Sequence, residues 1–124
     1  MEVTRQKPLV NQYHFDLRNQ AWEAENGEPK TQLKVDFKLI EKGTEENVTR
    51  IITILQFMIV LEDFVISGTM TQGVTILDRI VNEPSEFSEE ERRSLALPLL
   101  DILKRMTYEV TEIALDQPGI NLEF

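Results

Sequence analysis

The chain has 124 residues, 41% of them hydrophobic and 28% charged, which is the balance of a globular domain and is too apolar for a disordered segment. Thirteen basic residues oppose 22 acidic ones, and the formal net charge of −9 disfavours phosphate backbones, so we expect no nucleic-acid partner. No cysteine is present, which excludes disulfides and thiol catalysis, and the length is that of one domain spanning residues 1–124.

The N-terminal region predicts a strand followed by a loop. Tyr13, Phe15 and Leu17 alternate with polar residues, and a period of two is typical of a half-buried strand. Asn26-Gly27 then interrupts the pattern, as expected at a loop.

The middle of the chain predicts a meander of three strands. Residues 33–39 alternate between apolar and charged side chains, residues 48–60 are rich in β-branched side chains, and residues 64–71 follow as the next strand. The polar segment 43–47 and the short segment 61–63 are expected to be turns. Connections this short leave no room for the crossover that parallel pairing needs, so we expect an antiparallel sheet.

The last third predicts an irregular segment and then a long helix. Gly73 is expected to mark a bulge or a strand end, and the connection up to residue 87 is expected to be exposed, with a short helical turn. Ser88 and Glu91 have the spacing of a capping box, and apolar residues then recur every three or four positions to about Leu115. Pro98 predicts either a kink or the first turn of a separate helix. The fold class is therefore α+β.

The strand over residues 48–60 is apolar on both faces. One set of alternating side chains contains Ile52, Ile54 and Met58, and the other contains Ile51, Leu55 and Phe57. One amphipathic helix covers only one face of a sheet. Either the chain itself covers the second face, or another subunit or a client polypeptide does, because large exposed apolar patches usually mark interaction sites.

No segment predicts export or a membrane span. The N-terminus has no apolar core of a signal peptide, and the most apolar stretch, residues 51–61, is much shorter than the about 20 apolar residues of a membrane-spanning helix. We therefore expect a cytoplasmic protein without a membrane partner.

From about Trp22 to Phe124 the chain resembles SecB, the bacterial export chaperone. The meander ends in Gln72-Gly73, Leu97-Pro98 opens a long helix, and the ending DQPGINLEF is similar to a SecB segment. The ending also resembles, more closely, a family of short bacterial proteins grouped with SecB by fold. The resemblance implies a four-stranded antiparallel sheet packed by a long C-terminal helix, a homodimer or homotetramer, and apolar grooves that hold unfolded chains without ATP. It does not imply delivery to the export motor, because the SecB tail that engages the motor has no counterpart before Phe124.

The residues give little support for a catalytic or metal-binding site. His14 is the single histidine, and zinc sites rarely combine one imidazole with carboxylates alone, so we expect it to be exposed or at an interface. The carboxylate clusters lie in expected loops or at a helix start, where solvation and capping explain them. Asp78 and Glu83 remain the candidates for an enzyme or ligand site. We predict no catalytic, cofactor-binding or metal-binding residues, and no cofactor.

The hypothesis with most support is a non-enzymatic, protein-binding oligomer that holds non-native chains in the manner of SecB. The alternative is a dedicated interaction module that binds one folded partner and lacks chaperone activity. In either case the partner is a polypeptide. We expect the client or oligomer surface to come from six apolar residues: Ile52, Ile54, Phe57, Met58, Phe64 and Ile66.

Overall fold

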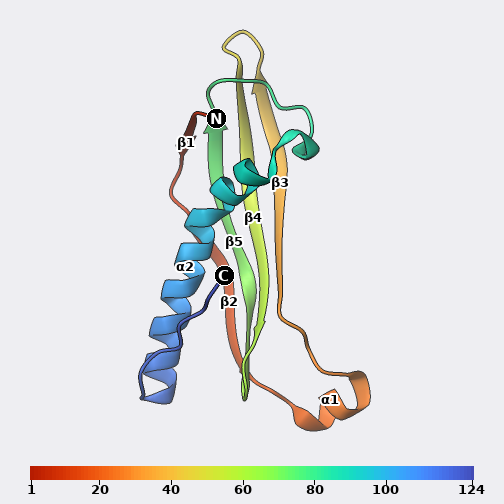
Figure 1. The fold of residues 1–124 in the computed structure, drawn as a ribbon, viewed down its shortest axis with the longest axis vertical. Helices are drawn as coiled ribbons and strands as arrows, with labels where there is room; N and C mark the ends of the chain where they lie inside the picture. Colours follow the sequence, from red (N-terminus) through yellow and green to blue (C-terminus); the bar gives the residue numbers. More distant parts are fainter. The chain divides into compact units, whose positions relative to one another are not determined.

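The computed structural model describes residues 1–124 in two compact units, Met1–Glu86 and Phe87–Phe124. The protein is α+β, as expected, with an antiparallel sheet in the first unit and a long helix in the second (Figure 1). In chain order the first unit contains β1 (Val3–Arg5), β2 (Leu9–Leu17), α1 (Gln20–Asn26), β3 (Gln32–Gly43), β4 (Val48–Val60), β5 (Phe64–Ile76) and the short 3₁₀ helix η1 (Pro84–Glu86). The second unit contains α2 (Glu89–Leu115).

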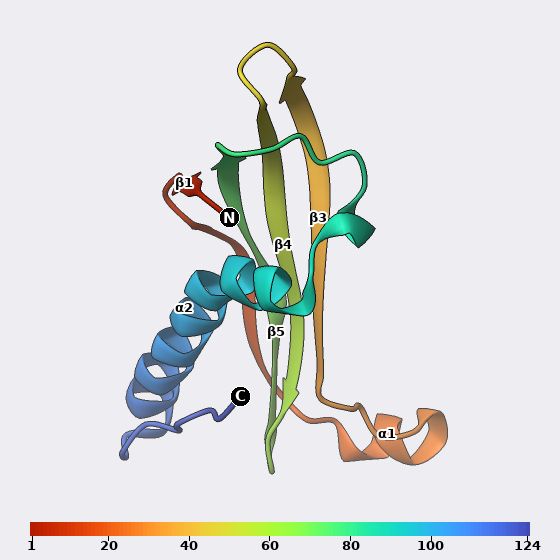
Figure 2. The same cartoon turned by 45° about the horizontal axis from the view of Figure 1, so that its top comes forward.

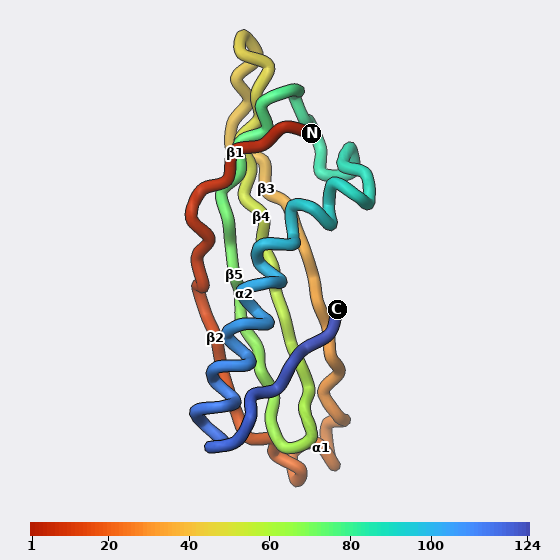
Figure 3. Tube along the Cα trace, turned by 60° about the vertical axis from the view of Figure 1, so that its left-hand side comes forward, coloured from red at the N-terminus to blue at the C-terminus, as the bar shows by residue number.

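The sheet has five strands, and the expectation of four is wrong. Its order is β1-β5-β4-β3, with β2 also paired to β5, so β1 and β2 follow one another along the same edge of β5 (Figures 1 and 3). Arg5 pairs with Val74 and Leu9 pairs with Thr71. Between these two pairs, the N-terminal segment therefore contains one residue more than β5 does. The extra residue, together with Pro8, which has no backbone N–H to donate, divides the edge into two strands.

The predicted meander of β3, β4 and β5 is confirmed, with antiparallel pairing throughout. Asn47 adopts a left-handed conformation (φ 58°) in the β3–β4 turn, and Leu61 N donates to Phe64 O (2.8 Å) in the β4–β5 turn. The prediction that Gly73 marks a bulge or a strand end is wrong. Gly73 lies inside β5, opposite Ile52, where a Cβ atom would collide with Gln6 Oε1.

The short helix α1 is absent from the sequence prediction. Asn19 caps it by accepting a hydrogen bond from Trp22 N (3.0 Å), and Gly27, in a positive-φ conformation, follows its end. The segment that contains α1 joins β2 to β3, which lie at opposite edges of the sheet (Figure 2). The first strand of the set β2–β5 thereby pairs with the last, which is a Greek-key arrangement.

The two faces of the sheet differ sharply in burial. The inner face is the face that carries the odd-numbered residues of β4 (49–59) and the even-numbered residues of β5 (64–76). Five of its apolar side chains are at most 1% exposed: Ile51, Leu55, Ile66, Met70 and Ile76. The segment after β5 covers one end of this face, where Val81 N donates to the buried Thr49 hydroxyl (2.9 Å). The opposite, outer face carries half-buried and exposed side chains.

The second unit is helix α2 and the segment that follows it. The predicted capping box is confirmed, since Glu91 N donates to Ser88 Oγ and Ser88 N donates to the Glu91 carboxylate. The helix continues through Pro98 without a break, so Pro98 does not open a separate helix. After Leu115 the chain folds back along α2 (Figure 3), and Ile120 N donates to Thr111 Oγ1 (2.8 Å). No helix has both the length and the apolar composition needed to cross a membrane.

Candidate functional site

The outer face of the sheet carries three parallel rows of different chemistry. The row on β4 is largely apolar and consists of Ile52, Ile54, Gln56, Met58 and Val60. The neighbouring row on β5 consists mainly of hydroxyl side chains: Ser67, Thr69, Thr71 and Thr75. The row on β3 is exposed and consists of Gln32, Lys34, Asp36 and Lys38. A half-exposed apolar row between hydrogen-bonding rows has the amphipathic character of a binding surface.

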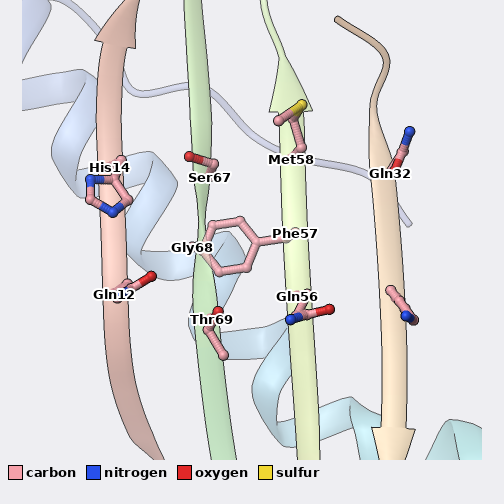
Figure 4. A pocket seen from close by; sticks show the side chains of 10 residues that line it. Gln12, His14, Gln32, Gln56, Phe57, Met58, Ser67, Gly68 and Thr69 are labelled. Carbon is pink, nitrogen blue, oxygen red and sulfur yellow. The ribbon is translucent and has the colours of Figure 1, made fainter.

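Strand register places six of these side chains, together with Gln12 and His14 of β2, in two neighbouring rungs that cross the sheet. One rung runs from Gln12 through Thr69 and Gln56 to Lys34. The next rung runs from His14 through Ser67 and Met58 to Gln32. The two rungs surround a shallow hollow of about 320 Å³. Figure 4 shows side chains of both rungs around this hollow, which come from β2, β5, β4 and β3.

The floor of the hollow depends on Gly68. This glycine lies in β5 opposite Tyr13 on one side and Phe57 on the other. The Phe57 side chain extends toward Gly68 (Figure 4), and a Cβ atom there would come 2.8 Å from Phe57 Cζ and would collide with the Gln12 carbonyl oxygen. The absence of a side chain at Gly68 therefore leaves room for the buried Phe57 ring, and both residues take part in lining the hollow between the outer-face polar side chains.

The hollow carries little formal charge. Lys34 contributes the single permanent charge among its lining residues, at the β3 edge, and its ammonium lies 3.7 Å from the Asp36 carboxylate. The remaining polar groups are three glutamine amides, one serine, one threonine and His14. Farther along the sheet, the Arg50 guanidinium pairs with the Glu41 carboxylate (2.7 Å), so these two charges offset each other. The surface is thus suited to hydrogen bonding and apolar contact rather than to recognition of a charged group.

The six residues expected to form the client or oligomer surface divide between the two faces. Ile52, Ile54 and Met58 lie together on the outer face, where Met58 is 37% exposed. Phe57, Phe64 and Ile66 have the inner-face parity; Phe57 and Ile66 are buried, and Phe64 stacks on Phe15 with ring centroids 4.7 Å apart. The outer-face three therefore form one surface, and Phe57, although buried, is among the residues that line the hollow.

Comparison with known proteins assigns the family. Residues 1–124 match the family described as "Protein of unknown function (DUF1149)". The chain belongs to this family. A crystal structure of a protein of unknown function from Streptococcus agalactiae is 56% identical, with a TM-score of 0.96 over 100% of this chain and 98% of that one. No curated protein matches the chain.

A SecB-like chaperone is also among the solved structures similar to this DUF1149 protein, at a distance. It comes from Mycobacterium tuberculosis and was solved in complex with a peptide from an antitoxin. Its sequence is 12% identical, and the TM-score is 0.46 over 98% of this chain and 86% of that one.

The polar members of the two rungs were missed by sequence reasoning in this DUF1149 protein. Gln12, Gln56, Ser67 and Thr69 belong to three different strands, and each alone is an ordinary polar residue on a strand face. The signal that unites them is register, which depends on non-local pairing. His14 is exposed, as expected, and no local pattern indicates that it shares a rung with Met58.

The carboxylates considered for chemistry have structural partners. Asp78 accepts a hydrogen bond from Glu2 N (3.1 Å), and Glu83 accepts from the Ser85 hydroxyl (3.4 Å). The two acids therefore sit in local contacts of the segment after β5. Among all the described residues, no three His, Asp or Glu side chains lie close enough to hold a metal ion.

Proposed function

We propose that this protein is a non-enzymatic, polypeptide-binding oligomer that holds non-native chains without ATP, and that the outer face of the sheet is its binding surface. The observation that carries the proposal is the pair of polar rungs, with Lys34 as their single charged side chain, flanked by apolar residues of β4. The proposal is in keeping with the resemblance of the sequence to SecB. It places the protein in the cytoplasm, where newly made chains are available.

The apolar row on β4 supplies the attraction for unfolded chains. Ile52, Ile54 and Val60 are half-buried, and Met58 is exposed, so each offers surface that a bound side chain removes from water. Each Å² of apolar surface buried contributes roughly 25 cal/mol. Methionine adapts its shape to different partners, which suits a surface that accepts many sequences.

The two rungs supply groups for the backbone of the bound chain. A glutamine amide both donates and accepts hydrogen bonds, and serine and threonine hydroxyls do the same. Gln12, Gln56 and Gln32 therefore offer partners for the N–H and C=O groups of an extended peptide, which every sequence carries. Recognition of this kind does not depend on the sequence of the client.

The test is suppression of aggregation of a chemically unfolded substrate protein by stoichiometric amounts of the purified chain. We expect Ile54→Lys and Met58→Lys each to weaken suppression severalfold, because a lysine in the apolar row replaces surface that the client buries. The matched control is Ile113→Lys, which changes an apolar residue of α2 that is 79% exposed. Aggregation that proceeds unchanged with the wild-type protein would overturn the proposal. In that case, capture of one folded partner in a fixed ratio would favour the dedicated interaction module.

A further inference from the structure

β3 is an edge strand of the sheet. β3 ends the sheet and pairs with β4 alone. Its register with β4 is regular from Gln32 to Leu39 and shifts between Leu39 and Glu41. Beyond the shift, Lys42 Nζ donates to Asn82 Oδ1 of the segment after β5 (2.8 Å). The regular stretch 32–39 is therefore the part of the edge on which another strand can add, and proteins usually protect such edges.

The side chains of this stretch alternate strictly between the two faces. The outer face receives Gln32, Lys34, Asp36 and Lys38, and the inner face receives Leu33, Val35, Phe37 and Leu39. Leu33 is 39% exposed although it is apolar. When two copies of one strand pair antiparallel, a two-fold axis passes through the pair, and like faces match only if one residue lies opposite its own copy.

The charges decide where that two-fold axis lies. An axis at Asp36 places two aspartates together and puts Lys34 opposite Lys38 of the partner subunit, which is repulsive. An axis at Val35 places Lys34 opposite Asp36 of the partner subunit, twice by symmetry, and Leu33 opposite Phe37 of the partner subunit. An axis at Phe37 carries the pairing beyond Leu39 into the register shift.

We propose that two copies of this chain pair antiparallel through β3, about a two-fold axis at Val35. The pairing joins the two sheets edge to edge, so the outer faces of both copies become one continuous surface. It gives the oligomer of the proposed function an interface and rests on that proposal. The whole chain has a net charge of −9, which opposes self-association, whereas the β3 stretch alternates in sign and complements itself.

The opposite edge of the sheet offers a shorter regular stretch. The register of β2 with β5 shifts between Val10 and Gln12, and β2 ends at Leu17. Regular pairing there covers residues 12–17, against residues 32–39 on β3. Pairing through β2 is therefore the competing arrangement that the experiment must distinguish.

The experiment uses the absence of cysteine from the chain. In Val35→Cys, the two thiols face each other across the axis, and disulfides form when Cβ atoms lie roughly 3.5–4.5 Å apart. We expect oxidation, or a short bismaleimide, to give a covalent dimer from the full chain. The controls are the exposed positions Lys38→Cys, whose copies lie six residues apart along the paired strands, or about 20 Å, and His14→Cys on β2. We expect at least tenfold less dimer from either control.

Charge reversal gives the second measurement. In the Val35→Cys background, Lys34→Asp places like charges opposite each other twice, and we expect the dissociation constant of the dimer to rise about tenfold. Adding Asp36→Lys restores the complementary pattern and the original constant. A dimer cross-linked better through His14→Cys, equal cross-linking at Lys38→Cys, or failure of the double reversal to restore affinity would overturn the proposal.

The experiments distinguish a failure of the proposed chaperone function from a failure of the proposed β3 interface. A Val35→Cys dimer that forms but does not slow aggregation leaves the β3 interface standing and removes the chaperone function. A chain that slows aggregation while remaining a monomer at all concentrations removes the β3 interface alone.

Discussion

Arg18 donates two hydrogen bonds to the carboxylate of Glu23, from Nη2 to Oε1 at 2.6 Å and from Nε to Oε2 at 3.2 Å. The same guanidinium donates from Nη1 to the carbonyl oxygens of Leu61 (3.1 Å) and Glu62 (3.3 Å). Arg18 follows β2, Glu23 lies in α1, and the two carbonyls belong to the β4–β5 turn. One side chain thus fastens the crossing segment of the Greek key to the hairpin that it passes.

Glu23→Gln is predicted to remove a pH dependence of stability. The hydrogen bond from Arg18 lowers the pKa of Glu23, although desolvation opposes the shift. Because the folded-state pKa lies below that of the unfolded chain, the carboxylate contributes its stabilisation above the unfolded value of about 4.3, and loses it as the pH falls through the folded value. Urea unfolding at pH 7 and at pH 3.5 is expected to show a smaller loss of unfolding free energy on acidification in the variant than in the wild type.

The control for this prediction is Glu25→Gln, which changes an exposed carboxylate of the same helix. It is expected to leave the acid-induced loss of stability at the wild-type size. Equal losses in the wild type and in Glu23→Gln would show that the hydrogen bonds from Arg18 do not favour the charged carboxylate.

Gly68→Ala is predicted to destabilise the sheet. The new Cβ atom meets the Gln12 carbonyl oxygen and Phe57 Cζ, and forcing extra volume into a packed site costs about 1–3 kcal/mol. Urea unfolding measures the loss. Ser67→Ala, one residue earlier in β5, removes an oxygen without adding volume and is expected to change the unfolding free energy by less than about 0.5 kcal/mol. If both variants are equally stable, the close approach at Gly68 does not exist in solution.

Thr111→Val is predicted to loosen the segment that folds back along α2. Thr111 Oγ1 donates to Thr107 O (2.6 Å) and accepts from Ile120 N (2.8 Å), so valine leaves the Ile120 amide without its partner. Loss of a hydrogen bond of about 1 kcal/mol corresponds to roughly fivefold faster hydrogen exchange at that amide. Thr111→Ser keeps the hydroxyl and is expected to retain most of the protection. If hydrogen exchange at the Ile120 amide is unchanged in Thr111→Val, other contacts hold the segment against α2, for example the contact of Lys104 with the Phe124 ring.

The sequence was sufficient for the elements whose periodicity is long and local. The alternation in β3, the β-branched run of β4 and the capping box at Ser88 each predict an element that the structure confirms. The helix α1 was not predicted, because its seven residues are too few to show a repeating helical pattern of apolar side chains. Its cap, Asn19, is a residue type that is also common in loops. The split of the N-terminal edge at Pro8 depends on pairing with β5, which no local pattern reveals.

The candidate site was predictable only in part. Both parities of β4 are apolar, so sequence alone did not decide that Ile52, Ile54 and Met58 face outward while Phe57 is buried. The two polar rungs arise from registers among four strands, and a shift of one residue in the β2–β5 or the β4–β5 register would separate Gln12 from Gln56. Non-local register is what places these groups, and it follows from the whole sheet.

Thr53 and Thr49 provide a matched test of buried hydroxyl groups on one strand face. Both lie on the inner face of β4 and are 0% exposed. The Thr49 hydroxyl donates to Arg79 O (3.0 Å) and accepts from Val81 N (2.9 Å), whereas Thr53 Oγ1 has no hydrogen-bond partner. Thr49→Val is expected to lower the unfolding free energy by about 1–3 kcal/mol, because it leaves two buried backbone groups unpaired.

Thr53→Val is expected to keep or raise the unfolding free energy, by up to about 1 kcal/mol, because it removes a buried polar atom that has no partner. Urea unfolding of both variants beside the wild type gives the comparison. The Gln72 amide, directly opposite Thr53, also has a buried oxygen without a partner. If Thr53→Val is destabilised as much as Thr49→Val, the Thr53 hydroxyl must be hydrogen-bonded in solution, and the Gln72 oxygen across the strand pair is then the acceptor that Gln72→Met would remove.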